Sequence, residues 1–175
     1  MGAPFIGLSL TLALALDSGG GASAGPFDRA AISYGAAINR ALEEAGSDLR
    51  FTLDRCETVP QWECHFSSPG IAIVVHGGEQ QTSIGRITIA ADILKGHPTT
   101  LPHMVVLDAL IALTATMIVF DPDLPPAQRN GMVSSLAASV HRTGHGEERG
   151  IAADYGIGLH EAASTLLVIT ATPRQ

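Results

Sequence analysis

The segment LRFTLDRCETVPQWECHFSS, residues 49–68, decides the fold, because apolar and polar residues alternate on both sides of a proline. Alternation with a period of two predicts a β-strand that buries one face. Pro60 lies between the two alternating runs and suits a turn. The segment therefore predicts a β-hairpin centred on Pro60, whose apolar residues share one core: Phe51, Leu53, Trp62, Cys64 and Phe66.

The only two cysteines of the chain, Cys56 and Cys64, fall opposite each other in this hairpin. Opposed residues of an antiparallel pair lie roughly 4.5–5.5 Å apart at Cα, a separation that a disulfide spans. The C-x7-C spacing matches neither a redox C-x-x-C motif nor a zinc knuckle. Since paired cysteines are oxidised outside the cytosol, we expect a structural Cys56–Cys64 disulfide.

Two further strands follow the hairpin. The run at 71–75 is continuously apolar, as in a strand that is buried on both faces or covered by a helix. Residues 83–91 alternate again. Short turns separate the four strands, which favours an antiparallel meander.

Before the hairpin, residues 26–48 carry helical signals, with Asp28 as the expected N-cap and Gly46 as the C-cap residue. Alanine makes the helix narrow enough to lie close against a sheet. Its apolar stripe comprises Tyr34, Ile38, Ala41, Leu42 and Ala45.

The segment LPHMVVLDALIALTATMIVF, residues 101–120, is apolar on nearly all sides and carries one charge, Asp108. Such a helix is either a central buried helix or a membrane span. Met104–Phe120 is near the lower limit of a spanning length.

After residue 120 we expect one more helix, capped by Asp123, with Pro125 or Pro126 in its first turn and Gly144 at its end. Its stripe comprises Met132, Val133, Leu136, Ala137 and Val140. We expect a polar loop at HRTGHGEERG, residues 141–150, and then strands at 150–159 and 165–170. The fold class predicted is α+β, with helices on one face of a mainly antiparallel sheet in the order α-ββββ-αα-ββ.

The N-terminal region has the layout of a secretory signal. An apolar stretch at 6–16 precedes the small residues Ala22-Ser23-Ala24, although the first residues lack Lys and Arg. The alternative is a core element followed by a glycine linker. We expect a signal peptide at 1–24, a single domain at 25–175, and export to the periplasm or the extracellular space.

Charge excludes one class of partner. Ten Lys and Arg residues stand against seventeen Asp and Glu residues, for a net charge of −7. A general nucleic-acid binder needs the opposite balance.

Seven histidines are the first place to look for chemistry. His141 and His145 lie four residues apart, and Glu147 follows, which would suit a zinc site. However, the glutamate of an H-E-x-x-H motif is absent and Gly144 ends the helix between the histidines, so a solvated loop is the favoured interpretation. We expect no partner triad for the remaining histidines, which include His76, His97, His103 and His160.

Asp108 is the one charge that the pattern places in an apolar setting. It could act as a general acid or base beside a serine nucleophile, for which the sequence offers Ser83, Ser134 and Ser135. A hydrogen bond or an exposed groove is the simpler explanation. No G-x-S-x-G motif and no phosphate-binding loop supports catalysis.

These observations favour an exported protein that binds a protein partner or a small ligand through its sheet face or a sheet edge, without catalysis or a cofactor. Two alternatives stay open. One is a metal-assisted hydrolase that uses His141, His145 and Glu147. The other is a membrane-anchored subunit, which signal cleavage makes the less favoured interpretation.

Overall fold

The computed structural model describes residues 27, 29–58, 62–78, 83–93, 102–161 and 164–174. Its strands are β1 Thr52–Glu57, β2 Glu63–Ser68, β3 Ile71–Gly77, β4 Ile84–Asp92, β5 His145–Arg149, β6 Ala153–Glu161 and β7 Thr165–Pro173. Its helices are α1 Tyr34–Glu44, which a short 3-10 turn precedes, α2 Pro102–Phe120 and α3 Pro126–Thr143. The predicted signal peptide, Asp28 and the turn around Pro60 lie outside the described residues.

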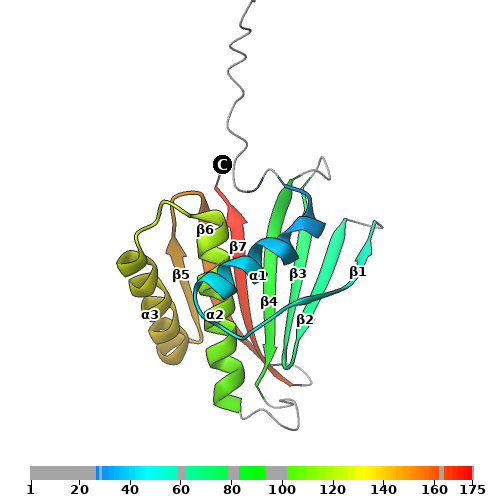
Figure 1. Ribbon diagram of the computed structural model, residues 1–175. Coiled ribbons are helices and arrows are strands. Elements are labelled where there is room, and N and C mark those ends of the chain that lie inside the picture. The colour runs from blue at the N-terminus through cyan, green and yellow to red at the C-terminus, as the bar shows by residue number, and fades with distance from the viewer. Residues whose placement is uncertain are drawn as a thin grey trace, which may run out of the picture.

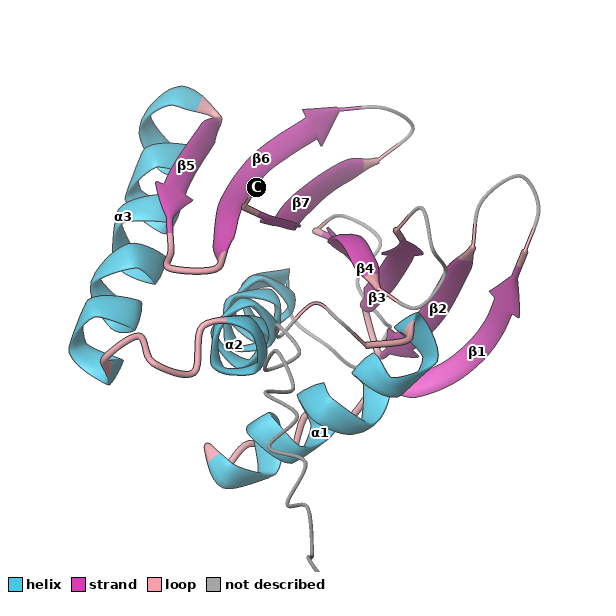
Figure 2. Cartoon of the chain, turned by 90° about the horizontal axis from the view of Figure 1, so that it is seen from above, coloured by secondary structure: helices cyan, strands magenta, loops and turns pink. Residues whose placement is uncertain are grey.

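The strands form one antiparallel sheet of seven strands in the order β1-β2-β3-β4-β7-β6-β5 (Figure 1). Seen from above, the sheet is curved and the three helices lie on one side of it (Figure 2). This arrangement confirms the predicted α+β class and the predicted meander of the first four strands. The opposite face of the sheet carries no described helix.

The predicted hairpin is formed by β1 and β2, and its register places Cys56 directly opposite Cys64. The two residues form a disulfide, as predicted. The expectation that Leu53 joins the core is wrong, because its side chain is 41% exposed. A bulge interrupts the pairing after Leu53, and β1 is the edge strand of the sheet.

Helix α1 buries most of its predicted stripe, although Ala45 is exposed. The close approach to the sheet is made by a glycine: a Cβ on Gly35 would collide with the ring of Phe66. Tyr34 packs edge-on against the same ring and stacks on Phe120 of α2. Gly46 follows the helix with a φ of 72°, the left-handed conformation expected of its C-cap residue.

Helix α2 is the central helix, and it packs against α1, α3, β3, β4 and β7. By length and composition alone, His103–Phe120 could cross a membrane. Its fully buried side chains include Leu113, Met117 and Phe120, which pack in the core that the sheet forms with the helices. A central core helix therefore accounts for this apolar segment.

Helix α3 begins with Pro126 in its first turn, as predicted, but its N-cap residue is Pro125 and not Asp123. Gly144 ends the helix with a φ of 79° and donates its N–H to the carbonyl of Val140.

The segment after this helix is not the predicted loop. Residues 145–149 form β5, an additional strand that pairs with β6. Gly146 lies so close to Ser139 of α3 that a Cβ there would approach the serine Cβ to 2.7 Å. Ladder hydrogen bonds and contact with α3 thus outweigh the polar composition of this segment.

A buried carboxylate connects the end of α2 to the turn between β5 and β6. Asp121 is 1% exposed and accepts hydrogen bonds from the hydroxyl of Tyr155, at 2.7 Å, and from the backbone N–H of Ala152. A Cβ on Gly150 would collide with the same carboxylate. Because the Asp121 carboxylate is buried and both bonds cross from the end of α2 to β6 and its preceding turn, they fix the position of the last three strands relative to α2.

Candidate functional site

The open face of the sheet displays side chains that alternate with the core residues. One row crosses five adjacent strands in direct register and comprises Val74, Thr88, Thr170, Gly156 and Glu147. These residues are small or polar, whereas their chain neighbours Ile87, Ile89, Ile169 and Tyr155 are buried on the other face. Any ligand that contacts the sheet has to contact this row or its neighbours.

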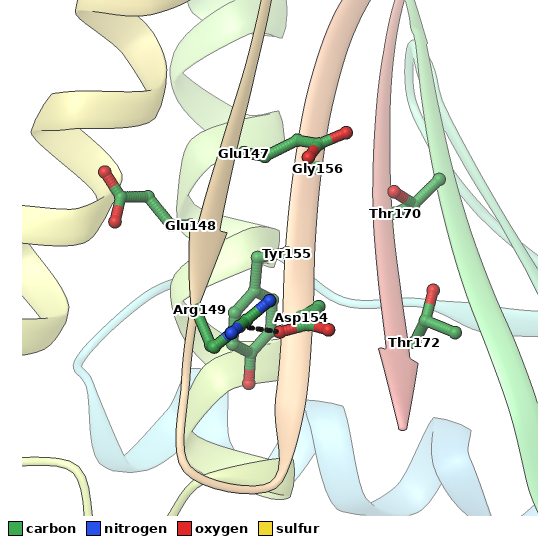
Figure 3. Close-up of a pocket in the computed structure, with 8 residues that line it drawn as sticks. All are labelled: Glu147, Glu148, Arg149, Asp154, Tyr155, Gly156, Thr170 and Thr172. Carbon is green, nitrogen blue, oxygen red and sulfur yellow. Dashed lines mark hydrogen bonds and ion pairs between the residues drawn. The ribbon is translucent and has the colours of Figure 1, made fainter. Parts of the chain in front are cut away.

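A groove of about 630 Å³ lies on this face over β5, β6 and β7 (Figure 3). It falls within the usual volume range of ligand sites. Its lining residues are Glu147, Glu148, Arg149, Asp154, Tyr155, Gly156, Thr170 and Thr172. In Figure 3 the side chain of Glu148 extends toward α3, so Glu147 supplies the carboxylate on the groove side.

Gly156 keeps the floor of the groove low. A Cβ at this position would approach the Thr170 hydroxyl oxygen to 2.7 Å, closer than side-chain atoms normally come. The absence of that atom leaves the hydroxyl of Thr170 and the backbone of β6 accessible from the open face.

The charges around the groove are unequally paired. Asp154 forms ion pairs with two arginines: its Oδ1 lies 3.3 Å from Nε of Arg149 and 3.7 Å from Nε of Arg174. Glu147 forms no hydrogen bond or ion pair within the described part of the chain. The groove therefore offers one free carboxylate, two threonine hydroxyls and the carboxylate of Asp154, which already has two arginine partners.

A second polar cluster lies on the same face, over β2, β3 and β4. One oxygen of the Glu63 carboxylate lies 2.9 Å from Nδ1 of His76, and the other lies 3.6 Å from Nε2 of His65. Nε2 of His76 lies 3.4 Å from the hydroxyl of Thr88. No motif in the sequence predicts this cluster, although Glu63 and His65 stand two residues apart on one strand and would share a face.

The histidines proposed for a metal site lie apart from this cluster. His141 is exposed on the last turn of α3, while His145 begins β5 and its Nδ1 lies 3.2 Å from the carbonyl of Thr143. Glu147 belongs to the groove. Across the described ranges, no group of three or more His, Cys, Asp or Glu residues is arranged to hold a metal ion.

Asp108 lies at a second pocket, of about 330 Å³, near the turn between β2 and β3. Burial raises the pKa of its carboxyl group. The other lining residues are Asp48, Leu49, Arg50, Ser68 and Pro69, so the pocket contains none of the three serines proposed as its nucleophilic partner. Ser134 and Ser135 lie on α3. His97 lies outside the described residues, and His103 and His160 are exposed.

Comparisons with known protein families, with curated proteins and with solved structures find no match to this chain. The function is therefore argued from the open face itself.

Proposed function

We propose that this chain is an exported protein that binds a protein partner or a small ligand on the open face of its sheet. The groove over β5, β6 and β7 carries the proposal, because it combines a suitable volume with a free carboxylate and accessible hydroxyls. Binding, and not turnover, is the role that this groove supports.

The sheet edges are less suitable for binding. The free edge belongs to β1, which carries a bulge together with the charged residues Asp54, Arg55 and Glu57. Bulges and charges on an edge strand oppose the addition of another strand. At the other edge, β5 packs beside α3 (Figure 2). These features favour the face over the edges.

Export is supported by the disulfide, because both cysteines of the chain are paired. Such a bond fits an oxidising compartment. The signal-like layout of residues 1–24 supports the same proposal. The periplasm and the extracellular space both meet this requirement.

The groove favours a polar ligand that donates hydrogen bonds. Glu147 can accept from an ammonium or guanidinium group, and Thr170 and Thr172 can donate or accept. Tyr155, the aromatic residue among the lining residues, is 1% exposed, so its ring is not available for stacking. A basic side chain of a partner protein or a small amine has the required chemistry.

The alternatives have less support. His141, His145 and Glu147 form no metal-binding group, and α2 packs within the core. We therefore propose neither a metal-assisted hydrolase nor a membrane anchor.

The test is an affinity pull-down of the tagged, exported protein from its own host. The groove variant combines Glu147→Arg with Thr172→Arg. The control combines Glu43→Arg with Ala36→Arg on the exposed side of α1, which makes the same change in charge. We expect wild type and control to retain the same ligand or partner and the groove variant to lose it. Equal recovery by all three proteins would place binding elsewhere.

A further inference from the structure

We propose that Thr88, His76 and Glu63 form an acyl-transfer site in which the Thr88 hydroxyl attacks the carbonyl carbon of a carboxylic ester. The inference adds a chemical step to the open face and does not depend on the binding role of the groove. It rests on the geometry of the second polar cluster, which lies one strand beyond the groove.

The carboxylate of Glu63 determines which nitrogen of His76 carries the proton. An ionised carboxylate accepts hydrogen bonds but donates none. Because Nδ1 of His76 lies 2.9 Å from this carboxylate, Nδ1 carries the hydrogen in the neutral ring. The lone pair of Nε2 is then available to the hydroxyl of Thr88, 3.4 Å away. Thr88 is thus placed as the nucleophile, His76 as the base, and Glu63 as the carboxylate that orients the base, an order that activates a hydroxyl.

The cluster is both held in place and accessible. The side chains of His76 and Glu63 are 16% and 30% exposed, and Thr88 is half-buried. All three project from paired strands, with Glu63 opposite His76 on β2 and β3. Strands position such groups more rigidly than loops do. His65, 3.6 Å from the second oxygen of Glu63, restrains the carboxylate from its other side and is a positioning residue.

Arg86 supplies a charge beside the reaction centre. It lies two residues before Thr88 on β4, on the same face, and directly opposite His76 in the register. Arg86 is exposed and makes no hydrogen bond or ion pair with any described residue. An oxyanion that develops at the attacked carbonyl would be stabilised by such a donor.

The reaction proceeds in two balanced steps. In the first, the Thr88 oxygen bonds to the carbonyl carbon, its proton moves to Nε2 of His76, and the alcohol leaves with that proton. In the second, water attacks the Thr88 ester, His76 takes a proton from the water and returns it to the Thr88 oxygen, and the carboxylic acid departs. Ester and water are the only reactants, and no oxidation occurs.

Thr170 offers a matched control for Thr88. It is the same residue type, on the same face, and directly opposite Thr88 in the register of β4 and β7. No hydrogen bond from its hydroxyl to a histidine occurs within the described part of the chain. Only Thr88 should therefore be activated.

The experiment uses the exported chain with its disulfide intact and p-nitrophenyl acetate as the probe. The release of p-nitrophenolate gives the rate, and peptide mass spectrometry locates the acetyl group. We expect acetylation at Thr88 in wild type, none at Thr170 of the same protein, and none at position 88 in the isosteric Thr88→Val. His76→Gln should lower the rate of acetylation at Thr88 by about 10²-fold, the usual contribution of a general base.

Absence of acetyl-Thr88 in wild-type protein quenched with acid within the first turnover, together with release of p-nitrophenolate at the uncatalysed rate, would overturn the proposal without any variant. Equal labelling of Thr88 and Thr170, or unchanged labelling of Thr88 in His76→Gln, would also overturn it. The variant with Glu43→Arg and Ala36→Arg on the exposed side of α1 should still be acetylated at Thr88.

Discussion

The two faces of the sheet use the same strands for different purposes. On β4, Ile87 and Ile89 point to the helices and are at most 1% exposed, whereas Thr88 and Ala90 point to the open face. The covered face is almost entirely apolar, so its energy comes from burial and close packing. The open face mixes polar residues with half-buried apolar residues such as Val74 and Val168, and we expect its side chains to contribute less to stability. The fold and the proposed function therefore reside in alternate residues of the same strands.

The comparison is tested most strongly by placing one charge on each face of β4. Ile89→Asp puts a carboxylate into the core without a partner, and we expect a loss of more than about 4 kcal/mol, a large part of the stability of an ordinary domain. Ala90→Asp, one residue further on, should change the free energy of unfolding by less than about 1 kcal/mol. Urea denaturation measures both. A comparable loss in the two variants would show that the open face is also packed.

The disulfide lies at the edge of the covered face, where Cys64 is fully buried. Replacing Cys56 and Cys64 with alanine should lower the free energy of unfolding by about 2–3 kcal/mol, because the unfolded chain regains the freedom of a short loop. Binding at the groove, measured well below the melting temperature, should be unchanged. A double variant that stays folded but loses binding would assign the cysteines a direct role.

A substitution at Tyr155 tests the buried hydrogen bond between its hydroxyl and Asp121. Tyr155→Phe leaves the buried Asp121 with one hydrogen bond fewer and should cost about 1–2 kcal/mol at neutral pH. Burial, followed by the hydrogen bond and the charge of Asp121, raises the pKa of the Tyr155 hydroxyl. Burial also raises the pKa of Tyr34, against the weaker effect of its hydrogen bond with Thr116.

Because the pKa values of Tyr155 and Tyr34 are raised, the free energy of unfolding should decrease at alkaline pH. In the unfolded chain a tyrosine ionises near pH 10, whereas the folded protein keeps these two hydroxyls protonated. The contribution to stability is therefore present below pH 10 and is lost as the pH rises above it. Between pH 8 and 11, the free energy of unfolding, measured by urea denaturation, should decrease more steeply with pH for wild type than for Tyr155→Phe. Parallel curves would contradict the assignment.

Substitution of Asp108 should have the smallest effect on stability, because this residue lies outside the sheet and is only partly buried. Its raised pKa means that the folded state favours the protonated acid. Ionisation therefore lowers stability as the pH rises from the unfolded value, near 3.9, through the raised value. Asp108→Asn should slightly increase the melting temperature at pH 7 and have no effect at pH 3. The exposed Asp123→Asn serves as the control and should have no effect at either pH.

Local patterns in the sequence predicted most of the fold. Alternation around Pro60 placed Cys56 opposite Cys64, and Gly46 and Gly144 correctly indicated the ends of helices. Leu53 was misplaced because alternation does not reveal a bulge or how far the helices extend over an edge strand. Strand β5 was missed because its pairing with β6 and its contact with α3 compensate for a polar composition that resembles a loop.

The polar sites could not be assembled in the same way. Glu63 and His76 become neighbours only through the register of β2 and β3, and Thr88 joins them through the register of β3 and β4. Register between strands depends on packing over the whole face, which no short window of sequence contains. Glu147 was considered as a metal ligand, and the structure places it in the groove instead.

The bond between Cys56 and Cys64 also determines the outcome if a protease cuts the chain between them. Any single cut in residues 57–63 would leave two fragments joined through sulfur, each still attached to its part of the sheet. On a gel, the nicked protein would run as one band without reductant and as two bands with it. A cut elsewhere in the chain would have no such covalent link across it, so this hairpin is the one place where proteolysis leaves the molecule in one piece.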